Sequence, residues 1–204
     1  MKYNSSLDPQ TVIKHVVDMA MWEDRIWVNH VQRLFFIPIW RNANTQFMHV
    51  ADQYEFTLDL NPDVSEYTGF VFVRHPYNRI AGQYWRAMEN RGWTLESITE
   101  KMTNGQVEDP HFNTQCSFIT PWPDPKYYIN LDNIQHCGRP TIDSIVDTII
   151  SQKTKKISAL KNNSIDDYII SSIEIQQLIQ NYFSDDFKMF LKHFPDKHKL
   201  MDKI

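Results

Sequence analysis

The sequence predicts an α/β fold of three layers, in which a central parallel sheet is flanked by helices and carries a P-loop-like phosphate-binding turn. Two stretches support this prediction, residues 34–51 and 70–88. Each begins with a short apolar run typical of a buried parallel strand, continues through a polar turn and ends in helical spacing. In open α/β sheets, ligands bind in the crevice at the carboxyl ends of the strands. The same two stretches therefore predict the binding site.

The first stretch has the architecture of a phosphate loop. A buried strand is expected over residues 34–40 and a helix from residue 47. The loop between them would direct backbone N–H groups and the positive end of the helix at an anion. It contains no glycine, so it does not match the Walker A pattern. The residues expected to bind are Arg41, Asn42, Ala43, Asn44, Thr45 and Gln46.

The second stretch predicts an anion-binding corner. Its apolar run Phe70–Val73 stops at Arg74, and Pro76 suits the first turn of a helix. Apolar residues then recur at helical spacing, so Arg74 would lie at the carboxyl end of a strand and face the amino terminus of a helix. The alternative is a structural ion pair of Arg74 at the strand end.

The remaining elements follow from periodicity and capping signals. In chain order, we expect a surface helix within 11–33, a short strand within 54–60, a helix over Trp93–Met102 capped by Thr94, a long functional loop over Asn104–Pro125, a strand over Tyr127–Leu131, and helices over Asp143–Ser151 and Ser171–Phe183. All of them are expected to belong to one domain, residues 1–204.

Arg74-His75-Pro76-Tyr77-Asn78-Arg79, followed by Tyr84, resembles the arginine-x-proline-(aromatic)-x-arginine segment of the carbohydrate sulfotransferases. These enzymes take sulfate from 3′-phosphoadenosine 5′-phosphosulfate (PAPS). The resemblance implies that Arg74 holds the 3′-phosphate of the donor and that residues 41–46 hold its 5′-phosphosulfate. Thr45 matches the family threonine. Arg41 replaces a lysine, His75 an aspartate and Gly82 a phosphate-binding serine, so Gly82 would offer only a backbone N–H group.

Further similarities occur in the family order. Residues 109–115 resemble an Asp-x-His-Trp-x-x-Gln loop, residues 157–164 a loop that ends in Asn-x-Ser, and residues 181–190 the Tyr-x-x-Asp-(aromatic)-x-x-Phe closing helix. Together the similarities span about residues 35–190, and their order is the strongest support for the family.

Composition excludes several classes of protein. The net charge is -4, which disfavours a nucleic-acid binder. No apolar run approaches the ~20 residues of a membrane span, and the first residues lack a signal-peptide stretch, so a cytoplasmic location without a membrane span is expected. Cys116 and Cys137 are then more simply reduced thiols than a disulfide. No Cys/His spacing suggests a metal site.

The predicted function is in-line transfer of a sulfuryl group from PAPS to a hydroxyl of a carbohydrate or related acceptor. Positioning and electrostatics carry the rate of such a reaction, with no metal required. Arg41 would stabilise the leaving phosphate. His111 is favoured as the general base, and His49, Asp59 and Asp63 remain alternatives.

Two other functions stay open. A catalytically impaired homologue that binds PAPS or 3′-phosphoadenosine 5′-phosphate (PAP) is suggested by Arg41 and Gly82. A P-loop-type phosphotransferase is suggested by fold logic alone. The sequence specifies neither the acceptor nor the oligomeric state.

Overall fold

A five-stranded sheet forms the centre of the protein in the computed structural model, which describes residues 25–80, 83, 92–104, 112–133, 139–151 and 173–195. The strands lie in the order β3-β1-β2-β4-β5. Their bounds are β1 Arg25–Asn29, β2 Leu34–Ile37, β3 Thr57–Leu60, β4 Thr68–Val73 and β5 Tyr127–Asn130.

The sheet is mixed, whereas a parallel sheet was expected. β2, β4 and β5 run parallel to one another. β1 pairs antiparallel with both β2 and β3. A four-residue turn joins β1 to β2, in which Asn29 Oδ1 accepts from Gln32 N at 2.7 Å and Arg33 has a φ of 53°. Because this hairpin turn contains no glycine, it gave no turn signal in the sequence.

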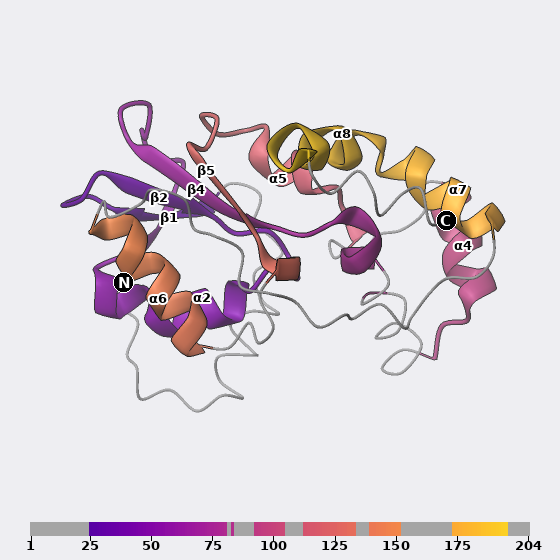
Figure 1. The fold of residues 1–204 in the computed structure, drawn as a ribbon, viewed down its shortest axis with the longest axis horizontal. Helices are drawn as coiled ribbons and strands as arrows, with labels where there is room; N and C mark the ends of the chain where they lie inside the picture. Colours follow the sequence, from indigo (N-terminus) through magenta and orange to yellow (C-terminus); the bar gives the residue numbers. More distant parts are fainter. Residues whose placement is uncertain are drawn as a thin grey trace.

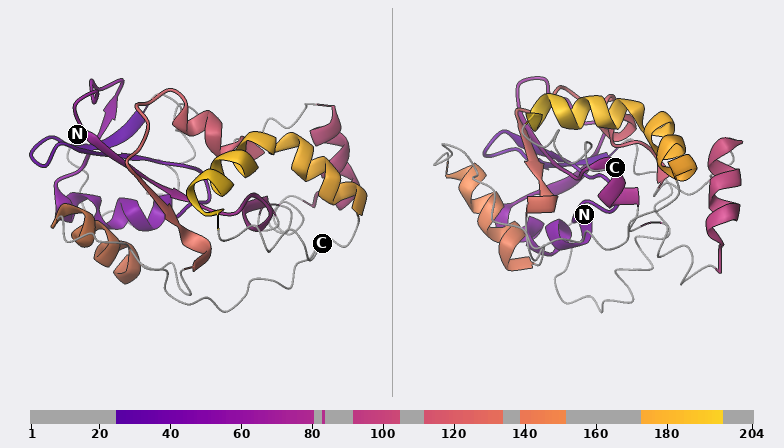
Figure 2. Two further views of the ribbon diagram at one scale, coloured as in Figure 1. Left: turned by 45° about the horizontal axis from the view of Figure 1, so that its top comes forward. Right: turned by 45° about the vertical axis from the view of Figure 1, so that its right-hand side comes forward.

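Helices cover both faces of the sheet, so the α/β class is confirmed. Helices α2 (Asn44–Ala51) and α6 (Arg139–Ile150) pack on one face. On the other face lie α5 (Gln115–Ile119) and α8 (Ser184–His193). Figures 1 and 2 show the two helical layers on opposite sides of the strands.

A third, smaller apolar cluster lies beside the sheet. It joins α4 (Leu95–Thr103) and α7 (Ile173–Tyr182) to α8, with Ile80 from the helix that begins at Pro76. Thr94 caps α4 as predicted, because its side chain accepts from Ser97 N while the Ser97 hydroxyl accepts from Thr94 N. Two short 3-10 helices, Asp52–Tyr54 and Leu131–Asn133, complete the described elements.

The expectation of a helix within 11–33 is wrong for β1, while residues 11–24 lie outside the described ranges. Trp27 joins the core under α2 and α6, whereas Ile26 and Val28 join the core under α5 and α8. A strand buried on both faces has no polar alternation, so periodicity does not distinguish it from a helix. The expected loop over Asn104–Pro125 likewise contains the short helix α5.

The pairing of β2 with β4 depends on a glycine. Gly69 lies opposite Phe35, whose ring is completely buried. A Cβ atom added at Gly69 would lie 2.3 Å from Phe35 Cζ. The ring therefore occupies the space that any other residue at position 69 would need.

We predict that Gly69→Ala lowers the free energy of unfolding by about 1–3 kcal/mol, because the Phe35 ring must leave its position in a tightly packed core. Chemical denaturation measures this change. Leucine lacks the distal ring atoms, so the same substitution in a Phe35→Leu background should cost clearly less. An equal cost in both backgrounds would contradict the assigned clash.

Candidate functional site

The predicted phosphate loop leads from β2 into α2 through two left-handed residues. The φ angles of Arg41 and Ala43 are 71° and 60°. Asn42 N donates to Ile39 O at 3.0 Å, which closes the turn. Ala43 is the N-cap of α2, and no side chain caps this helix. The first-turn N–H groups of α2 therefore form an end that favours an anion.

The other predicted loop residues surround this helix end. Asn42 is buried, Arg41, Asn44 and Gln46 are half-buried, and Thr45 is exposed. The loop thus has the fold position that was predicted, with the Thr45 hydroxyl available to solvent in the first turn.

The predicted anion corner directly follows β4, which pairs parallel with β2. Arg74 is half-buried, and its Nε finds no hydrogen-bond partner among the described residues. His75 N donates to the carboxylate of Asp132, which follows β5. A helix then begins at Pro76, as predicted. The carboxyl ends of three parallel strands thereby meet at one edge of the sheet.

The side chain of Gln115 connects the loop to the corner. Its Oε1 accepts from Arg74 N at 3.0 Å and from Asn42 Nδ2 at 2.7 Å. Its Nε2 donates to Arg74 O at 2.9 Å. Asn42 Nδ2 also donates to Phe72 O at 2.9 Å. Gln115, Asn42 and Arg74, here called the amide bridge, hold three segments together.

Asp186 on α8 fixes Gln115 from the opposite side. The carboxylate accepts from Gln115 N at 2.7 Å and from Cys116 N at 2.9 Å, while Thr114 Oγ1 accepts from Ser117 N at 3.1 Å. The amino terminus of α5 is thereby capped. Burial raises the pKa of Asp186, although these N–H donors and the charge of Arg79 oppose the shift.

Arg79 is a buried cation beneath the same corner, with only 2% of its surface exposed. Its Nε donates to Trp40 O at 3.3 Å, which ties the helix after Pro76 to the phosphate loop. Burial lowers the pKa of Arg79 to about 10; Asp186 opposes this shift and the positive charge of Arg74 adds to it. The two guanidinium groups thus repel each other. An anion bound at the corner would relieve this repulsion.

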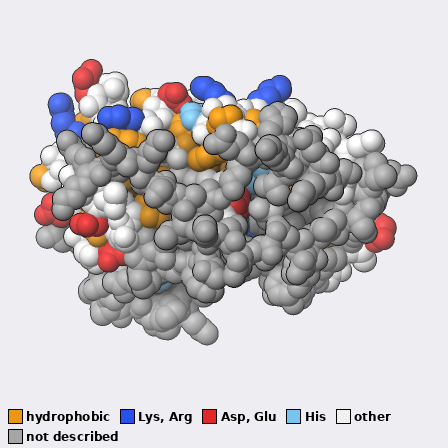
Figure 3. All heavy atoms as spheres, in the orientation of Figure 1, with side chains coloured by type: hydrophobic (Ala, Val, Ile, Leu, Met, Phe, Trp, Pro, Cys, Tyr) orange, Lys and Arg blue, Asp and Glu red, His pale blue; other side chains and the backbone are white. Residues whose placement is uncertain are grey.

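The His75 ring packs against aromatic side chains, at the position where the sulfotransferase resemblance predicts an aspartate. Its ring is stacked on Tyr77 with a centroid separation of 5.7 Å. It also meets the edges of Phe187 and Phe190 on α8, at 5.5 and 5.1 Å. Figure 3 shows hydrophobic side chains along the upper part of one face of the protein, with Lys and Arg side chains beside them.

Of the candidate general bases, His49 and Asp63 are exposed, and His111 is not described. His49 is exposed in the last turn of α2. His111 lies outside the described residues. Two other predicted features, Gly82 and the loop 157–164, also lie outside them. Asp63 is exposed and accepts from the Ser65 hydroxyl at 2.8 Å.

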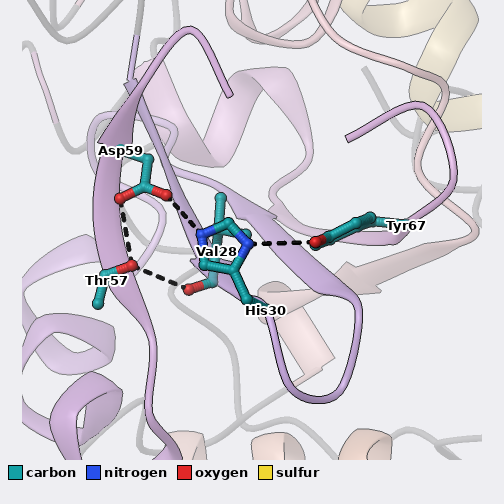
Figure 4. Close-up of polar contacts among 5 residues, drawn as sticks. All are labelled: Val28, His30, Thr57, Asp59 and Tyr67. Atoms are coloured by element: carbon teal, nitrogen blue, oxygen red, sulfur yellow. Dashed lines mark hydrogen bonds and ion pairs between the residues drawn. The ribbon is translucent and has the colours of Figure 1, made fainter. Parts of the chain in front are cut away.

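Asp59 belongs to a separate polar cluster at the β3 edge, drawn in Figure 4. Asp59 Oδ2 lies 2.9 Å from His30 Nε2, and Tyr67 Oη lies 3.1 Å from His30 Nδ1. Thr57 Oγ1 donates to Asp59 Oδ1 at 3.2 Å. Two strands, β1 and β2, separate β3 from β4, or about 14 Å at the usual strand spacing. Asp59 is therefore not part of the anion corner.

Gln115 and Asp186 were not predicted as site residues. Both stand in segments with recognised similarity, 109–115 and 181–190, but their bonding partners are distant in the chain. Gln115 and Asp186 are 71 residues apart, and Asn42 and Gln115 are 73 residues apart. No local pattern predicts such a contact.

No protein-family model, curated protein or solved structure matches the chain. No described helix has both the length and the apolar character needed to cross a membrane. Within the described ranges, no group of three or more His, Cys, Asp or Glu side chains could hold a metal ion.

Cys116 provides a probe of the packing around Asp186. Burial raises its pKa to about 12, with a further contribution from the Asp186 charge. In a Cys137→Ser protein at pH 8, we predict that Cys116 is alkylated at least about a hundredfold more slowly than a peptide thiol of pKa ~8.5, because little thiolate is present. The rate should also keep rising up to pH 10.

Timed alkylation followed by mass spectrometry measures this rate, with the same protein unfolded in guanidinium chloride as the control. Reaction at the peptide rate in the native state would contradict the described packing.

Proposed function

We propose that this chain is a sulfotransferase that moves a sulfuryl group from PAPS to a hydroxyl of a carbohydrate or related acceptor. One observation carries the proposal. Asn42, Arg74, Gln115 and Asp186 come from four segments that resemble sulfotransferase motifs, and hydrogen bonds join them in one network. The network borders an uncapped helix terminus and a half-buried arginine, which together favour a ligand with two anionic groups.

The two anion-binding features match the two ends of the donor. In this proposal, the 5′-phosphosulfate lies against the first turn of α2, with Arg41 and Thr45 beside it. Arg74 binds the 3′-phosphate, which distinguishes PAPS from ordinary adenine nucleotides. Cationic side chains and N–H groups then neutralise the charge that develops on the leaving phosphate.

His111 is the proposed general base for the acceptor hydroxyl, with His49 as the alternative. The described part of the His111 loop ends in Gln115, whose amide contacts both donor-binding segments. This connection supports a role for the segment 109–115 in the proposed reaction. The exposed position of His49 supplies no comparable connection.

A catalytically impaired homologue that binds PAPS or PAP is the second candidate. Arg41 replaces the family lysine, and its planar guanidinium does not fill the space of a lysine ammonium. The backbone φ of Arg41 is also positive, 71°, which is uncommon for a residue other than glycine. Donor binding is common to both candidates, whereas turnover separates them.

We predict that the wild-type protein binds PAP more tightly than ATP, and that Arg74→Ala weakens PAP binding several-fold to a thousandfold. This range corresponds to about 1.5–4 kcal/mol for a charge-assisted contact. Isothermal titration calorimetry measures both affinities. Arg33→Ala is a matched control, because Arg33 lies at the opposite end of the sheet, beside Tyr67.

If ATP binds as well as PAP, the phosphotransferase alternative replaces the proposal. If a folded Arg74→Ala protein keeps the wild-type affinity for PAP, the 3′-phosphate assignment is wrong.

For catalysis, we predict that Arg41→Ala lowers kcat far more than it weakens donor binding, since its charge acts chiefly as the bond breaks. His111→Ala should lower kcat about a hundredfold or more. A base must be deprotonated to act, so the wild-type rate should rise with pH through the histidine pKa. This acidic limb should vanish in His111→Ala and persist in Arg41→Ala.

Sulfate transfer from labelled PAPS to a panel of glycans, lipids and phenols, measured as a function of pH, tests these expectations. Full activity of His111→Ala would move the base to His49 or a carboxylate. Tight PAP binding without transfer to any hydroxyl would favour the impaired homologue.

A further inference from the structure

On the side of β2, the end of β4 and the residue Arg74 after it are held by side chains instead of a neighbouring strand. The β2–β4 ladder runs from Leu34 and Thr68 to Ile37 and Val71, after which β2 turns away into the phosphate loop. Beyond this point Phe72 O accepts from Asn42 Nδ2, and Arg74 N donates to Gln115 Oε1. The amide bridge thus continues the edge of β4 where the sheet opens for a ligand.

The bonding of Gln115 to Arg74 has the form of a peptide pair. One amide accepts the N–H of Arg74 and donates to its C=O, at 3.0 and 2.9 Å. Two such bonds to the same residue fix the position of its Cα atom and therefore the origin of the guanidinium side chain. Gln115 is itself fully buried, so water cannot easily replace these bonds.

The same amide also determines the position of the phosphate loop. Asn42 Nδ2 donates to Gln115 Oε1 at 2.7 Å. Because Asn42 directly precedes Ala43, the N-cap of α2, this bond also holds the start of α2. On the other side, Asp186 holds Gln115 N and Cys116 N. A shift of α5 would consequently move Arg74 and the end of α2 together.

We propose that Gln115 is a positioning residue that sets the distance between the anion corner at Arg74 and the phosphate loop at Asn42. The proposal rests on the sulfotransferase function proposed above. It assigns to Gln115 no contact with the donor. Its effect acts through Arg74 and Asn42.

The test compares Gln115→Met, which keeps the side-chain length and removes all three bonds, with the wild type. Gln53→Met is the matched control, since Gln53 is exposed and donates only to Asp143, at 2.9 Å, in the bonds described here. We expect Gln115→Met to speed hydrogen exchange of the Arg74 amide about five- to tenfold and to weaken PAP binding about tenfold or more. kcat should fall further, by about a hundredfold, because geometry matters most in the transition state.

A double-variant cycle identifies the route of the effect. Asn42→Leu and Gln115→Met should combine to less than the product of their separate losses in PAP affinity, because each removes the same bridge. If Gln115→Met does not fold, Gln115→Glu, which keeps an acceptor and loses the donor to Arg74 O, takes its place in the same measurements.

The outcomes separate the two claims. Wild-type protein that binds no PAP overturns the sulfotransferase proposal, and Arg74 exchange then still decides whether Gln115 fixes the corner. Wild-type protein that binds PAP, with Gln115→Met matching Gln53→Met in affinity, kcat and exchange, overturns the positioning role alone. Faster Arg74 exchange with weaker binding and a larger loss in kcat supports it.

Discussion

The fold of the candidate site depends on a buried side-chain amide, that of Gln115. It bonds to both backbone groups of Arg74 and to the side chain of Asn42, at the point where β2 and β4 separate. A sheet must open at its carboxyl edge to admit a ligand, yet a buried peptide group left without a partner costs about 1–3 kcal/mol. The amide bridge satisfies the peptide groups of Phe72 and Arg74 that extend beyond the β2–β4 ladder. Asp186 keeps the bridge in place by capping α5.

Buried charges and aromatic packing surround the amide bridge. Arg79 and Asp186 are both buried and act on each other electrostatically, while Arg74 is half-buried. The His75 ring packs against Phe187 and Phe190, so α8 is held by apolar contacts as well as by the Asp186 carboxylate. His75 thus helps to hold α8, the helix whose Asp186 supports Gln115. Cationic character at the corner is carried by Arg74.

Local patterns in the sequence predicted much of the fold. Buried parallel strands such as β4 are continuous apolar runs, and the Thr94 cap marks the start of α4, so both were found. β1 was missed because a strand buried on both faces lacks alternation, and the β1–β2 turn lacks glycine. Arg74 and the loop 41–46 follow adjacent parallel strands, as expected, whereas their binding roles stay predictions. The roles of Gln115 and Asp186 were not predictable, because they arise from contacts between segments 71 residues apart.

The most direct test of the site is its response to the donor product, observed residue by residue. In a backbone-assigned ¹⁵N spectrum, titration with PAP should shift the amides of Arg74 and of the first turn of α2, Asn44–Gln46, while the cluster at His30 and Tyr67 stays unchanged. An equal concentration of ATP should shift the Arg74 amide much less, because ATP has no 3′-phosphate. Saturable PAP shifts confined to other parts of the chain, or the same Arg74 response to ATP, would contradict the account.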